Sequence, residues 1–88
     1  MTGAADATSE GPPLERFAFE KLTRVLGATH GRGVFDETLA AAGLTAIRTP
    51  DDLYAFGARL SKRSGFEAAI GSLLTVAAVL RGASRHAP

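Results

Sequence analysis

The stretch FEAAIGSLLTVAAVL, residues 66–80, decides the fold because it is the most apolar segment of the chain. Its bulky apolar side chains cover more than half of a helical circumference, and small or polar residues form a narrow strip. A helix this apolar is typically surrounded by others, and one this short cannot span a bilayer. We therefore expect residues 66–80 to form an enclosed central helix, with Leu73 in the core.

Three segments with helical periodicity precede this stretch: residues 12–26, 33–42 and 49–63. In each, apolar residues recur at spacings of three and four, which is typical of a helix with one buried face. Nothing alternates with a period of two for long enough to indicate a strand. The sequence thus predicts an all-α, compact, four-helix bundle-like domain over residues 12–83, with disordered ends at 1–11 and 84–88.

Two helix boundaries carry specific signals. Gly43 and Leu44 fit a Schellman ending, in which the glycine takes a left-handed conformation and the leucine folds back onto Leu39. Thr49 is placed as an N-cap before Pro50 at the first helical position, and two carboxylates follow at the positive end of the helix dipole. These signals predict a helix that ends near residue 42 and another that begins at residue 50.

Several classes of function find no support in the sequence. Its 88 residues contain no cysteine, which favours a reducing compartment, and no secretory signal precedes the domain, so a cytoplasmic location is expected. The only histidines, His30 and His86, lack a second ligand at helical spacing, so no metal is expected. No nucleophile, acid–base pair or cofactor motif is recognisable. We therefore predict a protein that is not an enzyme and has no cofactor.

A glycine-rich segment, Gly27–Gly33, admits two interpretations. It reads as a connector between the first two helices, whose glycines permit a turn. It also contains His30 and Arg32 ahead of a helix, an arrangement that could hold a phosphate group. The segment lacks the lysine and the preceding strand of the known phosphate-binding loops, and the phosphate interpretation is left open as an alternative.

Charge is distributed unevenly along the chain. Residues 1–58 contain five basic and eight acidic groups, whereas residues 59–88 contain five basic groups and one acidic group. The basic residues include Arg59, Lys62 and Arg63 at one helix end and Arg81 after the last helix. Cations at these positions complement helix dipoles, and they also predict a basic face that docks onto an acidic protein surface, including a second copy of this chain.

Two further features predict contact surfaces. Small residues on the last helix, Gly71, Thr75 and Ala78, would let another helix approach closely, either within the chain or from a second subunit. Phe19 and Tyr54 fall outside the regular apolar stripes and would form an interface patch if exposed together. With no chemistry and a small core, we expect a protein–protein interaction or regulatory module that forms a homodimer.

An alternative function is a small DNA-binding regulator of the helix-turn-helix kind, built from Phe35–Arg63. The segment TLAAAGLT, residues 38–45, has the small residues typical of such turns. Against it, the connection is longer than usual, and the second helix begins with Asp51 and Asp52 where base contacts are expected. The sequence pI of about 8.3 is also below the strongly basic range of such domains.

Overall fold

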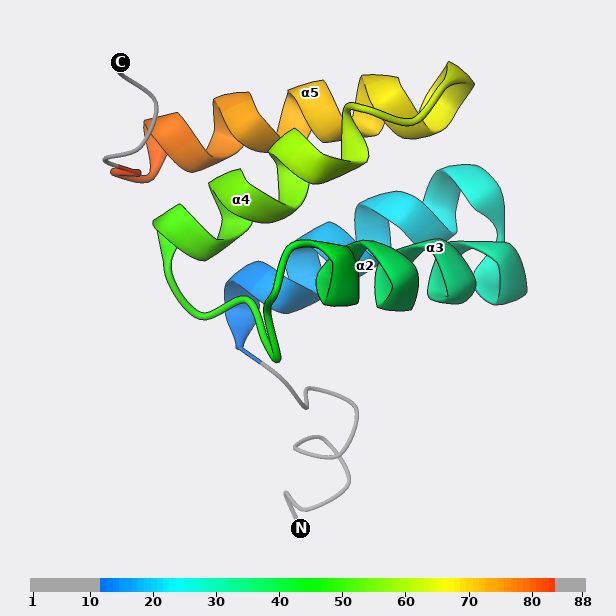
Figure 1. Cartoon of the computed structure of the whole chain (residues 1–88), viewed down its shortest axis with the longest axis horizontal. Helices are drawn as coiled ribbons and strands as arrows, with labels where there is room; N and C mark the ends of the chain where they lie inside the picture. The colour runs from blue at the N-terminus through cyan, green and yellow to red at the C-terminus, as the bar shows by residue number, and fades with distance from the viewer. Residues whose placement is uncertain (1–11, 84–88) are drawn as a thin grey trace, which may run out of the picture.

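The computed structural model describes residues 12–83 of the chain, and the two predicted disordered ends lie outside them. Four helices account for most of this range, and the described part contains no strand, so the predicted all-α fold is confirmed. Figure 1 shows them in chain order: α2 (Pro13–Leu26), α3 (Ala28–Ala41), α4 (Pro50–Leu60) and α5 (Gly65–Leu80).

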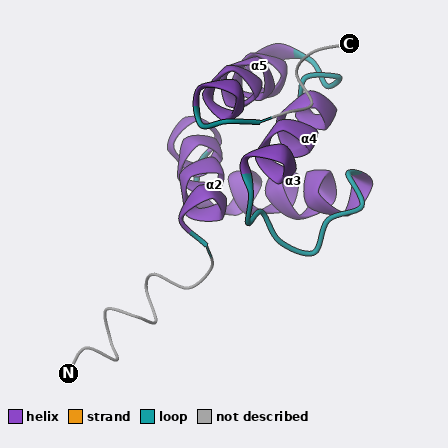
Figure 2. Cartoon of the chain, turned by 90° about the vertical axis from the view of Figure 1, so that its left-hand side faces the viewer, coloured by secondary structure: helices purple, strands orange, loops and turns teal. Residues whose placement is uncertain are grey.

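The helices form two antiparallel hairpins. In Figure 1, α2 and α3 run back along each other in the lower half, and α4 and α5 do so in the upper half. Most contacts between helices lie within a hairpin, and fewer join the two. Figure 2, turned by a right angle, shows α4 beside α5, with α5 above α2 and α4 above α3. The stretch between α3 and α4 therefore connects two helical hairpins.

A core of buried apolar side chains lies where the hairpins meet. The largest completely buried members come from α2, α4, α5 and the connection before α4. They are Phe56, Leu22, Ile47, Leu53, Leu60 and Leu74. An aromatic row crosses the same region: Phe19 packs edge-on against Phe35 at 5.4 Å between ring centroids, and Phe35 lies 5.3 Å from Phe56. This row joins α2 and α3 to α4.

The two predicted helix boundaries are confirmed. Gly43 has a φ of 75°, and the amide of Leu44 donates to the carbonyl of Leu39 at 3.0 Å, as a Schellman ending requires. At the start of α4, the Asp52 amide donates to Thr49 Oγ1 at 3.1 Å, and the Thr49 amide donates back to the Asp52 carboxylate. This reciprocal capping box fixes the first residue of α4.

Replacing Thr49 with alanine is expected to lower the free energy of unfolding by about 1 kcal/mol, because it removes the acceptor for the Asp52 amide. Urea denaturation followed by circular dichroism measures the change. Thr49→Ser keeps the hydroxyl and serves as the control, with a smaller loss. Equal stability of Thr49→Ala and the parent chain would show that the cap contributes nothing.

The prediction that the glycine-rich segment Gly27–Gly33 connects the first two helices is wrong. Helix α3 begins at Ala28 instead of residue 33, so only Gly27, with a φ of 92°, separates α2 from α3. Gly31 lies within α3 and is needed for close packing, since a Cβ there would stand 2.8 Å from the Thr23 Cα of α2. Residues 27–33 therefore do not form the loop that the phosphate interpretation requires.

The prediction of an enclosed final helix is also wrong in part. Helix α5 buries Ile70, Leu74 and Ala78, but its opposite face is open to solvent. Leu73, expected in the core, is 48% exposed. The reason is that α4 covers one face of α5 and the lower hairpin makes few contacts with it, so the rest of its apolar surface has no partner within residues 12–83.

A glycine pair sets the distance between α4 and α5. A Cβ built on Gly71 would lie 2.4 Å from the Ser61 amide nitrogen and 2.7 Å from the Gly57 carbonyl oxygen. A Cβ on Gly57 would lie 2.9 Å from the Gly71 carbonyl oxygen in turn. The two backbones therefore touch directly, which explains why small residues occupy this face of α5.

Candidate functional site

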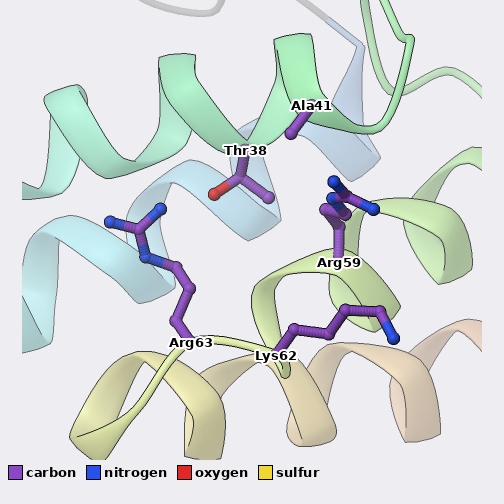
Figure 3. Close-up of a pocket in the computed structure, with 5 residues that line it drawn as sticks. All are labelled: Thr38, Ala41, Arg59, Lys62 and Arg63. Carbon is purple, nitrogen blue, oxygen red and sulfur yellow. The ribbon is translucent and has the colours of Figure 1, made fainter.

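The most distinctive polar site lies between α3 and the C-terminal end of α4. It is a pocket of about 280 Å³ lined by residues from both hairpins. Figure 3 shows them: Thr38 and Ala41 come from α3, and three basic side chains come from the end of α4 and the turn after it, namely Arg59, Lys62 and Arg63. The three cations are among those that the sequence predicts as a basic face.

Local structure at the end of α4 places these cations on one side. After Leu60 the chain continues in tight turns, with the Lys62 amide donating to the Arg59 carbonyl at 3.2 Å and the Arg63 amide to the Leu60 carbonyl at 3.0 Å. Residues 59, 62 and 63 keep the three- and four-residue spacing that groups side chains on one helix face. The turn thereby extends the basic face beyond the last residue of α4.

Arg63 is paired with two carboxylates of the described part of the chain. It binds the Glu67 carboxylate on α5, and its Nη2 lies 3.4 Å from Glu37 Oε1 on α3. The hydrogen bond from Arg63 lowers the pKa of Glu67, with a smaller contribution from His30, whose Nε2 lies 3.3 Å from the other carboxylate oxygen. The same bond raises the pKa of Arg63, so both groups stay charged across the physiological range.

The remaining cations have no carboxylate partner. Among the residues that the structure describes, Arg59 and Lys62 take part in no ion pair. The pocket therefore has an excess of positive charge. Thr38 lies opposite, 2% exposed, and its hydroxyl has no hydrogen-bond partner. Sequence reasoning missed Thr38, because a threonine in a helix carries no signal of what packs against it.

A second candidate surface lies on α5, and we call it the α5 stripe: Phe66, Ala69, Leu73, Val76 and Leu80. Its large members are strongly exposed, with Phe66 at 72%, Val76 at 59% and Leu80 at 79%. The positions follow the alternating spacing of three and four residues that defines a coiled-coil seam. This spacing is visible in the sequence, but only the structure shows that the face it marks has no partner within residues 12–83.

The other residues predicted for an interface are distributed differently. Gly71 and Ala78 are buried within the chain, so neither is available to a second subunit, and Thr75 is half-buried. Phe19 and Tyr54 are half-buried and pack against the core, so they do not form the exposed patch expected of them. Arg81 lies over the Phe17 ring at 4.6 Å and lines no part of the pocket.

The described residues offer little else for chemistry. No group of three or more metal-binding side chains occurs within residues 12–83, and no helix there has the length and apolar character needed to cross a membrane. No protein-family model matches the sequence, and comparisons with curated proteins and with solved structures give no match. The pocket and the α5 stripe are thus two separate features of the described residues that bear on function.

Proposed function

We propose that this protein is a non-enzymatic protein–protein interaction module that self-associates through the α5 stripe. The observation that supports the proposal is the exposure of four large apolar side chains along one face of one helix. Contiguous apolar patches of this kind on the surface of one chain are often interaction sites. The cytoplasmic location expected from the sequence forms part of the same proposal.

A second copy of the chain is the occupant that the stripe fits best. Its spacing is that of a two-stranded seam, in which the same face of two helices interlocks about a two-fold axis. Residues 68–80 contain no charged group, so two copies can face each other without like-charge contact. A face of this kind is complementary to itself.

The size of the stripe predicts a weak dimer. Four exposed side chains on one helix face make a patch within the ~300–600 Å² of the largest apolar patch on a typical monomer, a size that is often functional. Two copies would bury roughly 800 Å² through the stripe alone, which is below the ~1,200–2,000 Å² of stable interfaces. We therefore expect a dimer that forms at micromolar to millimolar concentrations and dissociates on dilution.

Light scattering across a concentration series tests self-association. The average mass of the parent chain should rise with concentration, whereas the double variant Leu73→Glu with Val76→Glu should remain monomeric, because it places carboxylates in the apolar seam. Both positions are exposed in one chain, so the melting temperature of the dilute variant should stay close to that of the parent.

Ala40→Glu is the matched control, since it adds a carboxylate at an exposed position of α3 outside the stripe. This variant should dimerise like the parent chain. A parent chain that remains monomeric at millimolar concentration would refute self-association. Dimers of the double variant as strong as those of the parent would place the contact elsewhere.

The DNA-binding alternative gains no specific support. The connection between α3 and α4 spans residues 42–49, and the first turn of α4 presents Asp51 and Asp52. The basic side chains lie at the opposite end of that helix. Duplex DNA binding that weakens steeply with salt would favour this alternative over the interaction module.

A further inference from the structure

We propose that the pocket between α3 and the end of α4 binds a phosphate group, as a phosphate monoester or as inorganic phosphate. The site is separate from the α5 stripe, so it stands independently of the proposed self-association. Two observations within residues 12–83 carry it: two cations with no carboxylate partner in that range, and a buried hydroxyl with no hydrogen-bond partner there, all lining one pocket.

The Thr38 hydroxyl is the more informative of the two. Threonines inside helices usually satisfy the hydroxyl with a backbone carbonyl of the preceding turn. Thr23 does so with the Phe19 carbonyl at 3.0 Å, and Thr75 with the Ser72 carbonyl at 2.7 Å. Thr38 does not, although it is 2% exposed. Figure 3 shows its oxygen turned away from α3, on the side where Arg63 lies. Because Thr38 lines the pocket, an anion bound there could accept a hydrogen bond from this hydroxyl.

The surrounding charge favours an anion with more than one negative charge. Arg59 and Lys62 have no carboxylate partner, and Arg63 is shared with Glu67 and Glu37. In Figure 3, Arg63 and Arg59 stand on opposite sides of Thr38, and Lys62 lies below them. Donors on several sides suit a tetrahedral oxyanion, whose oxygens point in four directions. A phosphate monoester carries close to two negative charges at neutral pH and three acceptor oxygens.

The dimensions of the pocket limit the ligand. At about 280 Å³ it lies just below the range of pockets that enclose drug-sized molecules. It has room for a phosphate group with water around it. We therefore assign it to the phosphate group itself, with any attached molecule lying outside the pocket.

Nuclear magnetic resonance titration of the full chain at constant ionic strength tests the site. Sodium phosphate should shift the backbone amide signals of Thr38, Lys62 and Arg63 in a saturable way, with a dissociation constant in the millimolar range. Sodium acetate at the same ionic strength should give no saturable shift, because a monoanion with two oxygens cannot engage all the donors.

Variants at the pocket identify the groups responsible. The double variant Arg59→Gln with Lys62→Gln should lose about tenfold or more in phosphate affinity, because charge-assisted hydrogen bonds are the strong ones. Thr38→Val removes the hydroxyl at nearly constant shape, and should lose about threefold to tenfold in affinity without a lower melting temperature. Arg24→Gln, which removes an exposed cation of α2 outside the pocket, should bind phosphate like the parent chain.

Titration with two peptides distinguishes the two sources of the phosphate group, a phosphorylated side chain and inorganic phosphate. The probes are acetyl-Ala-phosphoserine-Ala-amide and the same peptide with serine. Tighter binding of the phosphopeptide than of inorganic phosphate would assign the pocket to a phosphorylated side chain, and equal binding would assign it to a free phosphate. Absence of saturation with both phosphate probes, or equal saturation in the Arg59–Lys62 double variant, would overturn the proposal.

Discussion

Replacing Gly71 with alanine is expected to lower the free energy of unfolding by about 3 kcal/mol or more, because the added methyl group has no space. Its Cβ would lie 2.4 Å from the Ser61 amide nitrogen, 2.7 Å from the Gly57 carbonyl oxygen and 2.8 Å from the Leu60 carbonyl carbon. All three atoms belong to the backbone, which cannot rotate away as a side chain can. The two helices must separate, and with them the buried contacts of Leu60 and Leu74.

Gly33→Ala is the matched control for this prediction. Gly33 also lies inside a helix, but a Cβ there meets nothing within 4 Å. Alanine should therefore raise the free energy of unfolding by about 0.5–1 kcal/mol, since it restricts the unfolded chain and favours the helix. Urea denaturation of both variants gives the comparison. A Gly71→Ala chain as stable as the parent would mean that α4 and α5 do not touch at these glycines.

Replacing Leu74 with alanine is expected to cost about 2–5 kcal/mol, because the side chain is completely buried and its loss leaves a cavity. A loss of this size is a large part of the stability of a small domain. Thermal unfolding followed by circular dichroism should show a clear drop in melting temperature. Leu74→Met, which keeps most of the volume, should recover most of the loss.

The neighbouring leucine provides the contrast. Leu73 is 48% exposed, so Leu73→Ala should cost the dilute monomer less than about 1 kcal/mol. Instead, it should weaken self-association if the α5 stripe is the contact. The sequence predicts Leu73 as a core residue and does not distinguish it from Leu74. A larger loss of stability from Leu73→Ala than from Leu74→Ala in dilute solution would mean that α5 is rotated relative to the structure.

Features held by short-range hydrogen bonds are those that the sequence predicts correctly. The Thr49 cap and the Gly43 ending depend on groups within five residues of each other, so residue types and spacing suffice. Glycine outside such patterns is ambiguous. The sequence places Gly31 in a turn, whereas the structure places it inside α3, where its missing side chain permits the close approach of α2.

The orientation of α5 could not be obtained from its own residues. The helix has apolar side chains over most of its circumference, so periodicity alone does not show which face turns inward. The choice is made by Gly71, which lies against the backbone of α4 at Gly57 and Leu60, and this contact leaves the α5 stripe outside. The cations of the pocket follow from helix spacing on α4, but Thr38 comes from another hairpin, and its position needs the tertiary fold.

The pocket has a further property because it straddles the boundary between the two hairpins. Thr38 and Ala41 belong to the lower hairpin, and the three cations belong to the upper one. The ion pairs His30–Glu67 and Glu37–Arg63 cross the same boundary, and pairs with such exposed members hold it weakly and respond to salt. An anion bound there would contact both hairpins. It would stabilise the folded chain, since a ligand held only by the folded state stabilises that state. Anion binding would then strengthen the contact between the two hairpins, and a change that loosens this contact would weaken anion binding.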